Sequence, residues 1–438
     1  MVINNYRQDS IKFDMRGIRV SAEEIIFYTG LILWLAQFYI SRTIFLDLFG
    51  GRLLTAVRYF CMLIFALKIF LSEKTVHMRA AAVFITAAAV FVVVQRQVNT
   101  GMPLIQVLLM IFAARDVSFR RICKVSLWTC AVLWAIPVMI DVIGIAQLER
   151  DVYKERVREF LNFNYVSYAS IYFNNIIFCA LYVTTEPRRL GKGGRAAAQK
   201  TAPWSLILFL SAVCVWLLGE TDTTFPFAIG MLFIALYVII VKFRIPLIPS
   251  SGTGKKILSS CYAVLALVTY LVCKNYNWQI PWQKKMDDFS HSRISLSFLG
   301  IRDYGVHLFG VQIKENTDLS QGRYFYIDSG YIKNLIGYGL IVFIMIILFY
   351  SVIMYAALLE HDRVLAIWLF CVALYSIFNN LLLSVSENAG LLAIWYAIGL
   401  LKWNRKKVRR GRAELKEYRM SLLSGEQAGK REQIERTA

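Results

Sequence analysis

The stretch NLIGYGLIVFIMIILFYSVIMYAAL (334–358) decides the fold class, because it contains no charged residue. A helix needs about 20 consecutive, mainly apolar residues to cross the hydrocarbon core of a membrane. This stretch is longer than that minimum. We therefore predict a transmembrane helix over 334–358.

Similar apolar windows recur along the whole chain. Of its 438 residues, 58% are apolar and only 18% are charged, whereas soluble domains have about 45–50% and about 25%. This composition excludes a disordered chain and a single soluble globule. We predict an all-α polytopic membrane protein, in which 98–114, with a short apolar core before Arg115, and 388–401, with about 14 residues, are the weakest spans. The twelve predicted spans lie near residues 24–40, 53–72, 78–95, 98–114, 122–146, 167–185, 204–219, 225–242, 257–273, 334–358, 364–383 and 388–401.

The distribution of basic residues predicts the topology, because Lys and Arg collect in cytoplasmic loops. With the N-terminus inside, 32 of the 49 Lys and Arg residues fall in cytoplasmic segments and 14 in external loops. Both termini are therefore expected in the cytoplasm. The predicted organisation is a cytoplasmic segment 1–23, one transmembrane domain 24–401 and a basic cytoplasmic tail 402–438. The start of that tail, KWNRKKVRRGR, suits contact with anionic membrane lipids.

This topology accounts for the net charge of +20, so we expect no nucleic-acid partner. The eight cysteines lie in or beside apolar segments without a CxxC pair, and the four histidines lack HExxH spacing. Cysteines in such surroundings behave as small apolar residues. The sequence therefore predicts no metal and no cofactor. The polar N-terminus also lacks the apolar core of a cleavable signal peptide.

Two predicted external loops, 147–166 and 274–330, are basic although the topology rule would keep them neutral. Long loops can escape the rule, which is one explanation. The alternative is that the loops bind an anion outside the cell membrane. Arginine suits phosphate, because its planar fork donates two parallel hydrogen bonds.

Four motifs along the chain resemble those of Wzy-type polymerases of bacterial O-antigen, capsule and exopolysaccharide. The resemblance covers roughly residues 110–345, together with the number of helices and the position of the large loop. It rests on ARDVSFRRICKVSL (114–127), REFLNFNYVSYASIYFNN (158–175), DFSHSRISLSFLGIRDYGVHLFG (288–310) and YFYIDSGYIKNLIGYGLIVFI (324–344). Within them, Ser292-Arg293-Ile294, Phe309-Gly310, Asp328-Ser329-Gly330-Tyr331 and Tyr338-Gly339 match the elements of that family.

The resemblance implies a glycosyltransferase in the bacterial cytoplasmic membrane that uses undecaprenyl-diphosphate-linked oligosaccharide. A sugar hydroxyl of one repeat unit would attack the anomeric carbon of the growing chain, and the lipid diphosphate would leave. Such a reaction needs no nucleotide sugar and, with arginines present, no metal. Preorganised cations stabilise the negative charge that grows on the leaving group. Membrane lipids and a chain-length regulator would be the partners.

Three residues are candidates for catalysis. Arg293 falls where the family has its arginine and would hold the diphosphate or position a sugar. Asp328 is the best acidic candidate, although an Asp there would also cap the next helix. His291, in the same loop, could act as a base.

Further residues are candidates for binding substrate because of their place in the external loops or inside a span. Tyr331 could stack on a sugar or mark the membrane interface. Arg58 lies within an apolar span, where a charge is costly unless it is paired or functional. The full set is Arg156, Arg158, Arg302, Arg323, Tyr331, Asp222 and Arg58.

Two other functions compete with this interpretation. A ligase that moves finished glycan to another acceptor would share the fold, the loop and the arginines. A flippase or exporter for lipid-linked oligosaccharide would instead need charges along a central path, and often shows two related halves. The sequence shows no such halves, and its polar residues concentrate in the two basic loops, which favours chemistry at the membrane surface.

Overall fold

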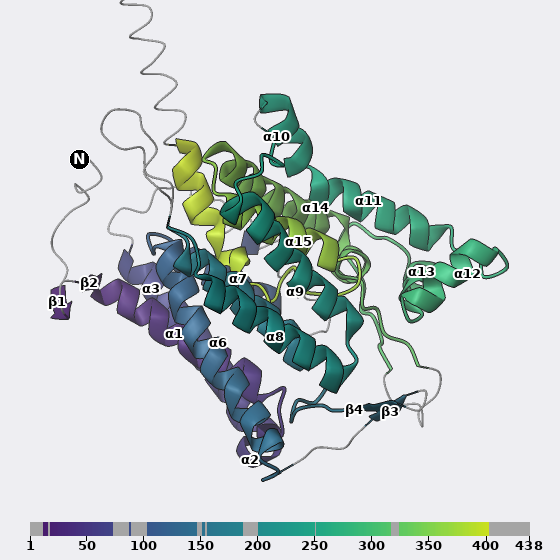
Figure 1. Cartoon of the computed structure of the whole chain (residues 1–438), viewed down its shortest axis with the longest axis horizontal. Coiled ribbons are helices and arrows are strands. Elements are labelled where there is room, and N and C mark those ends of the chain that lie inside the picture. Colours follow the sequence, from purple (N-terminus) through teal and green to yellow (C-terminus); the bar gives the residue numbers. More distant parts are fainter. Residues whose placement is uncertain are drawn as a thin grey trace, which may run out of the picture.

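The computed structural model describes residues 12–15, 18–72, 87–88, 103–146, 151–153, 156–186, 200–249, 251–316 and 324–402. This part of the chain is mainly helical (Figure 1). It also contains two antiparallel hairpins, in which β1 (Lys12–Met15) pairs with β2 (Ile18–Ser21) and β3 (Asp151–Tyr153) with β4 (Arg156–Arg158). The helices are α1 (Ala22–Ile40), α2 (Phe45–Phe49), α3 (Gly51–Ser72), α5 (Pro103–Ala113), α6 (Phe119–Val142), α7 (Tyr168–Thr184), α8 (Trp204–Thr221), α9 (Thr224–Tyr237), the π-helix η1 (Val238–Lys242), α10 (Gly252–Ser259), α11 (Cys261–Lys274), α12 (Pro281–Phe289), α13 (Arg293–Tyr304), α14 (Gly330–Leu359), α15 (Arg363–Tyr375) and the 3₁₀-helix η3 (Ala389–Ala393).

Six helices in the described ranges are long and apolar enough to cross a membrane: α1, α3, α6, α8, α9 extended by η1, and α14. The pair α10 and α11, bent by 42°, would make a seventh if it acts as one span. These helices confirm the coarse prediction of a helical, multi-pass membrane protein.

Other predicted spans are shorter than expected. The predicted span 98–114 is reduced to α5, with 11 residues, and 364–383 to α15, with 13 residues. Most of 78–95 lies outside the described residues. A helix of 13 residues is only about 20 Å long, less than the roughly 30 Å of a hydrocarbon core.

Helix α7 lies at the centre of the bundle, packed against α6, α8, α9 and α15. Every residue from Ala169 to Tyr182 is buried. Two of these buried residues are asparagines that bond to neighbouring segments. Asn174 donates to the carbonyl of Pro226 (2.8 Å) and Asn175 to that of Ser386 (3.0 Å). These bonds hold α7 against α9 and against the loop that follows α15.

Helix α14 is broken at Gly339, whose φ of +82° is outside the helical range. The chain around Gly310 (φ +72°) crosses this break. A Cβ on Gly310 would lie 2.3 Å from the carbonyl oxygen of Gly337, so only glycine fits the crossing. The N–H of Leu340 donates to the carbonyl of His307 (2.9 Å), which satisfies a backbone group freed by the break. Phe309-Gly310 and Tyr338-Gly339 therefore pack against each other at the break in α14.

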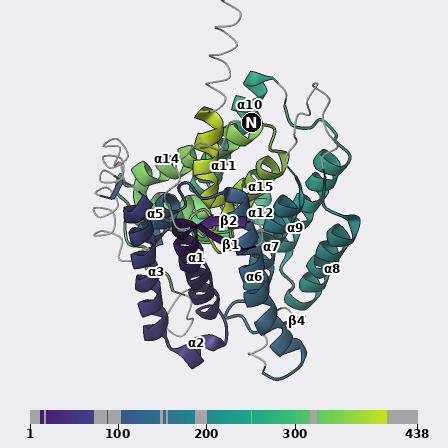
Figure 2. The same cartoon turned by 90° about the vertical axis from the view of Figure 1, so that its left-hand side faces the viewer.

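The predicted external loop 274–330 contains two helices, α12 and α13. Pro281 begins α12, where its missing N–H costs nothing. Helix α13 packs on α11 and α14 through a small apolar core that includes Ile294 and Ile327. Figure 1 shows α12 and α13 beyond the end of α11, far from the hairpin β1–β2, and Figure 2 shows α1 between α3 and α6. This packing fixes the beginning of α13 beside the chain that enters α14.

Candidate active site

The candidate site lies where several helices end on one side of the bundle. Helices α1 and α15 end there, and α7, α9 and α14 begin there. Backbone hydrogen bonds join the connecting segments. The N–H of Asn164 donates to the carbonyl of Arg42 (2.9 Å), and that of Gly330 to the carbonyl of Ser376 (2.9 Å). The sequence-based topology would place all of these helix ends outside.

Arg293 and Asp328, which the sequence singled out separately, form an ion pair. The Nε of Arg293 lies 3.2 Å from Oδ2 of Asp328, and both side chains are largely buried. Arg293 is the first residue of α13, and Asp328 comes two residues before α14. The hydroxyl of Ser329, not Asp328, caps α14 by accepting from the N–H of Ile332. The carboxylate of Asp328 is therefore available to orient Arg293.

The guanidinium of Arg293 is enclosed but not fully hydrogen-bonded. It lies 5.0 Å above the ring of Phe225 at the start of α9. Its Nη1 is buried and has no acceptor in the described part of the chain. A charged donor left without a partner is costly, and an anion with several oxygens would satisfy it. Arg293 is thus oriented by Asp328 through one nitrogen and keeps another donor for a ligand.

Burial raises the pKa of Asp328 above its usual range, and the charges of Arg293 and Lys333 oppose this shift. Desolvation disfavours the ionised carboxylate, whereas the two cations favour it. The ionisation of Asp328 therefore depends on its neighbours. Removing either cation would raise its pKa further.

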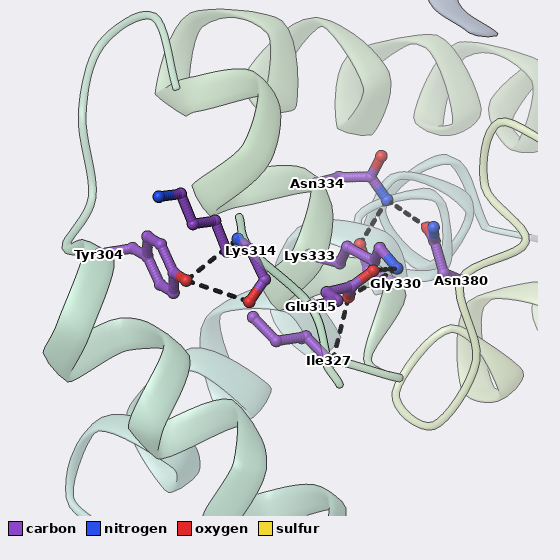
Figure 3. A network of polar contacts seen from close by, with 8 residues as sticks. All are labelled: Tyr304, Lys314, Glu315, Ile327, Gly330, Lys333, Asn334 and Asn380. Atoms are coloured by element: carbon purple, nitrogen blue, oxygen red, sulfur yellow. Dashed lines mark hydrogen bonds and ion pairs between the residues drawn. The ribbon is translucent and has the colours of Figure 1, made fainter. Parts of the chain in front are cut away.

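Lys333 and Glu315 form a second ion pair, which Figure 3 shows. The Nζ of Lys333, in the first turn of α14, lies 2.8 Å from Oε1 of Glu315 and 4.1 Å from the ring centroid of Tyr326. Glu315 also accepts the backbone N–H of Ile327 (3.2 Å). Glu315 therefore anchors the extended segment that carries Tyr326 and Asp328 into α14.

Asparagines join α14 to the loop 376–388, which follows α15. Figure 3 shows the Asn334 side chain pointing toward Asn380. Its amide donates to the side-chain oxygen of Asn380 (2.9 Å). This bond joins a side chain of α14 to one of the loop. It fixes the loop against the same end of α14 that carries Lys333.

Arg42 belongs to the site, although the sequence gave no reason to choose it. It lies in the short turn between α1 and α2. Its Nη1 donates to the hydroxyl of Tyr168 (2.9 Å), and the guanidinium lies 5.2 Å from the ring centroid of Tyr168 and 5.6 Å from that of Phe38. More than a third of Arg42 is still exposed. Arg42 thus presents a positive charge, backed by aromatic rings, to the surface of the site.

Glu387 is the second residue that the sequence did not indicate. It lies in the loop 376–388, outside the apolar helices, and is half-buried. Burial raises the pKa of Glu387 to about 7, although Arg42 and the Ser384 hydroxyl lower it. The available signal was an acid next to a predicted span, in SVSENAG (384–390). That signal is weak, because such an acid usually faces water.

Tyr326 joins these groups into one site. Burial raises the pKa of Tyr326, the charges of Glu315, Asp328 and Glu387 raise it further, and Arg42 lowers it. All four charged groups must therefore lie within electrostatic range of a single phenol. The site combines three acids, three cations and several tyrosine rings at one end of the bundle.

The structure corrects the role expected for Tyr331. Its ring is fully buried, and its hydroxyl donates to the carbonyl of Ala373 (2.8 Å) inside the bundle. Tyr331 therefore packs α14 against α15 and cannot stack on a sugar. Arg302, also predicted to bind substrate, is exposed at the far end of α13 and pairs with Asp303 (2.7 Å). It does not contact the other residues of the described site.

Three other predicted residues are not part of the described site. Arg58 is half-buried on α3, and no hydrogen bond or ion pair joins it to another described residue. Arg323 lies outside the described residues, and so does the side chain of Arg156. No structural role is assigned to these two arginines.

The remaining predicted residues border the site. Arg158 donates through Nε to the carbonyl of Thr221 (3.3 Å), which ties the hairpin β3–β4 to the end of α8. Asp222 adopts a left-handed conformation (φ 49°) directly after α8 and ends that helix. His291 is exposed in the turn between α12 and α13, with its ring edge-on to that of Phe225 (6.3 Å). These contacts hold the rim of the site together.

All eight cysteines are free. The described residues contain no group of three or more His, Cys, Asp or Glu side chains that could hold a metal ion.

A scan against protein-family models and searches of curated proteins and of solved structures found no match to this chain.

Proposed function

We propose that this protein is a membrane glycosyltransferase that polymerises oligosaccharide units carried on undecaprenyl diphosphate. The observation that carries the proposal is the arrangement of Arg293. Asp328 and Phe225 fix its guanidinium, and its buried Nη1 keeps a donor without an acceptor in the described chain. A diphosphate supplies the several anionic oxygens that such a donor needs.

The reaction would form a bond between a hydroxyl oxygen of the acceptor sugar and the anomeric carbon of the donor. The bond from that carbon to the diphosphate oxygen would break, and its electron pair would leave with the diphosphate. Arg293 and Lys333 would stabilise this charge, since fixed cations in a partly dry site need no reorganisation. Asp328 would keep Arg293 in place.

The proposal includes the finer topology predicted from the sequence: twelve spans, both termini in the cytoplasm and the site on the outer face of the bacterial cytoplasmic membrane. The substrate and membrane lipids would be the partners, with a chain-length regulator as a possible third. Cysteines introduced at exposed positions near residues 315 and 195 test this topology. In intact cells an impermeant thiol reagent should label only the first, and the reverse pattern would invert the arrangement.

The activity test uses purified protein in liposomes with the host's undecaprenyl-diphosphate oligosaccharide, and a gel that resolves single repeats. Wild type should give a ladder of products. Arg293→Ala should give none, whereas Lys285→Ala, which removes an exposed cation from the same loop, should keep the ladder. Protection of the sugar from external glycosidase without a ladder would favour a flippase, and transfer to a different acceptor would favour a ligase. Either result would overturn the proposal.

A further inference from the structure

A groove runs between α11 and α14, which pack against each other. It has a volume of about 460 Å³, and every side chain that lines it is apolar or aromatic. Ala263 and Leu267 line it on α11, and Ile344 and Leu348 line it on α14. The three larger side chains of this set are exposed. Within a membrane, such a groove suits a hydrocarbon chain.

The groove begins beside the candidate site. Ile332 lines it in the first turn of α14, directly before Lys333. The same Ile332 belongs to the small apolar core that contains Ile294, the residue after Arg293 at the start of α13. Tyr270 of α11 lines the groove and packs against this core as well. One packed cluster therefore joins the groove to the helix turn that carries the buried guanidinium.

The groove extends from the site deep into the bundle. Along α14 its lining runs from Ile332 to Leu348. With a rise of about 1.5 Å per residue, these two positions are roughly 24 Å apart. The hydrocarbon core of a membrane is roughly 30 Å thick. A chain in the groove would therefore follow the bundle through most of that depth.

We propose that this groove binds the polyprenyl chain of the lipid-linked substrate while Arg293 binds its diphosphate. The inference rests on the proposed function, and it adds a site for the part of the substrate that does not react. A polyprenyl diphosphate has an anionic head joined directly to an apolar tail. Such a ligand needs a cation at one end of an apolar groove, and the first turn of α14 brings the two together.

Two features favour a polyprenyl chain over the acyl chain of a bulk phospholipid. Ala263 and Ala266 in the lining are small, so they leave room for the methyl branches that an isoprenoid has and an acyl chain lacks. Nη1 of Arg293 is a buried donor without an acceptor in the described residues. A diphosphate presents the oxygens of two phosphate groups to this donor, whereas a phosphodiester presents those of one. A bulk phospholipid is the competing occupant.

The groove would act on affinity and not on the rate of the reaction. A tail makes the same contacts before and during cleavage of the glycosyl bond, so its binding energy is uniform along the reaction. Loss of uniform binding raises KM and leaves kcat unchanged. A change in the groove should therefore differ in its kinetic effect from Arg293→Ala, which removes a charge that acts on the leaving group.

The first experiment measures KM and kcat for polymerisation of the oligosaccharide carried on undecaprenyl diphosphate or on geranyl diphosphate. Ala263→Phe fills the groove from an exposed position, so the bundle need not move. It should raise KM for the undecaprenyl substrate about 10-fold, the loss from excluding roughly two methylene groups. Both kcat and the KM for the geranyl substrate should stay as in wild type. Val264→Phe, at the next exposed position but outside the lining, is the matched control.

The second experiment needs no activity. An undecaprenyl diphosphate analogue with a diazirine in its tail, irradiated with the protein in detergent, should label the lining of α11 and α14. Unlabelled undecaprenyl diphosphate should prevent this labelling, and phosphatidylglycerol at the same concentration should not. Ile344→Trp should prevent it as well, whereas Met345→Trp, exposed but outside the lining, should not.

Equal melting temperatures of each variant and its control show that both are folded. An unchanged KM in Ala263→Phe would overturn the inference and leave the proposed function intact. Labelling that phosphatidylglycerol prevents as well as undecaprenyl diphosphate does would assign the groove to bulk lipid and overturn the inference in the same way. Absence of a ladder with wild type would instead overturn the proposed function.

Discussion

Replacing Glu387 with glutamine should make the protein more stable at pH 8 but not at pH 4.5. Burial raises the pKa of Glu387 from 4.5 to about 7, so the folded state binds its proton more tightly than the unfolded chain. The stability gained from this proton is present below pH 4.5 and is lost as the pH rises through about 7. This rise in the pKa, from 4.5 to about 7, corresponds to ~3 kcal/mol of unfolding free energy. Glutamine cannot ionise, so the variant avoids this loss.

Melting of the purified protein in detergent, at pH 4.5 and pH 8, measures the effect. With an unfolding entropy of about 2.1 cal/mol/K per residue, a gain of ~3 kcal/mol over 438 residues raises the melting temperature by about 3 °C. We expect this rise at pH 8 and a difference near zero at pH 4.5. An equal difference at both pH values, or a less stable variant at pH 8, would refute the reasoning. The assay needs no substrate, so it tests the burial of Glu387 independently of any proposed activity.

Three further predictions follow from the site and the helix break. Asp328→Asn leaves the guanidinium of its partner buried without a counter-charge, so thermal unfolding should show a loss of about 3 kcal/mol or more; unchanged melting would contradict the pair. Gly310→Ala places a Cβ against the backbone of α14 at positive φ, so folded protein in the membrane fraction should fall sharply. Gly219→Ala, with nothing within 4 Å, should be recovered normally. Arg42→Gln removes the cation that lowers the pKa of Glu387, so its melting temperature should fall further below that of wild type at pH 8 than at pH 4.5, and an equal fall at both pH values would be inconsistent with this interaction.

Much of the fold could be predicted from local hydrophobicity, because each long apolar helix is encoded within its own window. The window 334–358 predicts the main part of α14. The short helices α12 and α13 were missed, because each is amphipathic and shorter than four turns. The proline at the start of α12 was a usable signal.

The site was only partly predictable, because its residues come from distant parts of the chain. Arg293 and Asp328 were found through motifs in one loop. Arg42 and Glu387 could not be found this way, since each is a single charge beside an apolar segment and only the packing of α1, α7 and α15 brings them together. Tyr331 was misjudged, because its position at the start of a helix does not reveal which neighbour covers its ring.

Backbone hydrogen bonds form where the chain at Gly310 crosses the break at Gly339. These bonds close the chain between the two glycines into a ring. Glu315, Tyr326 and Asp328 all lie within this ring. Hydrogen bonds between backbone atoms do not depend on most side chains, so only the glycines at this crossing are sensitive to replacement. Side chains within the ring can therefore be replaced while the ring stays attached to the bundle at the same point.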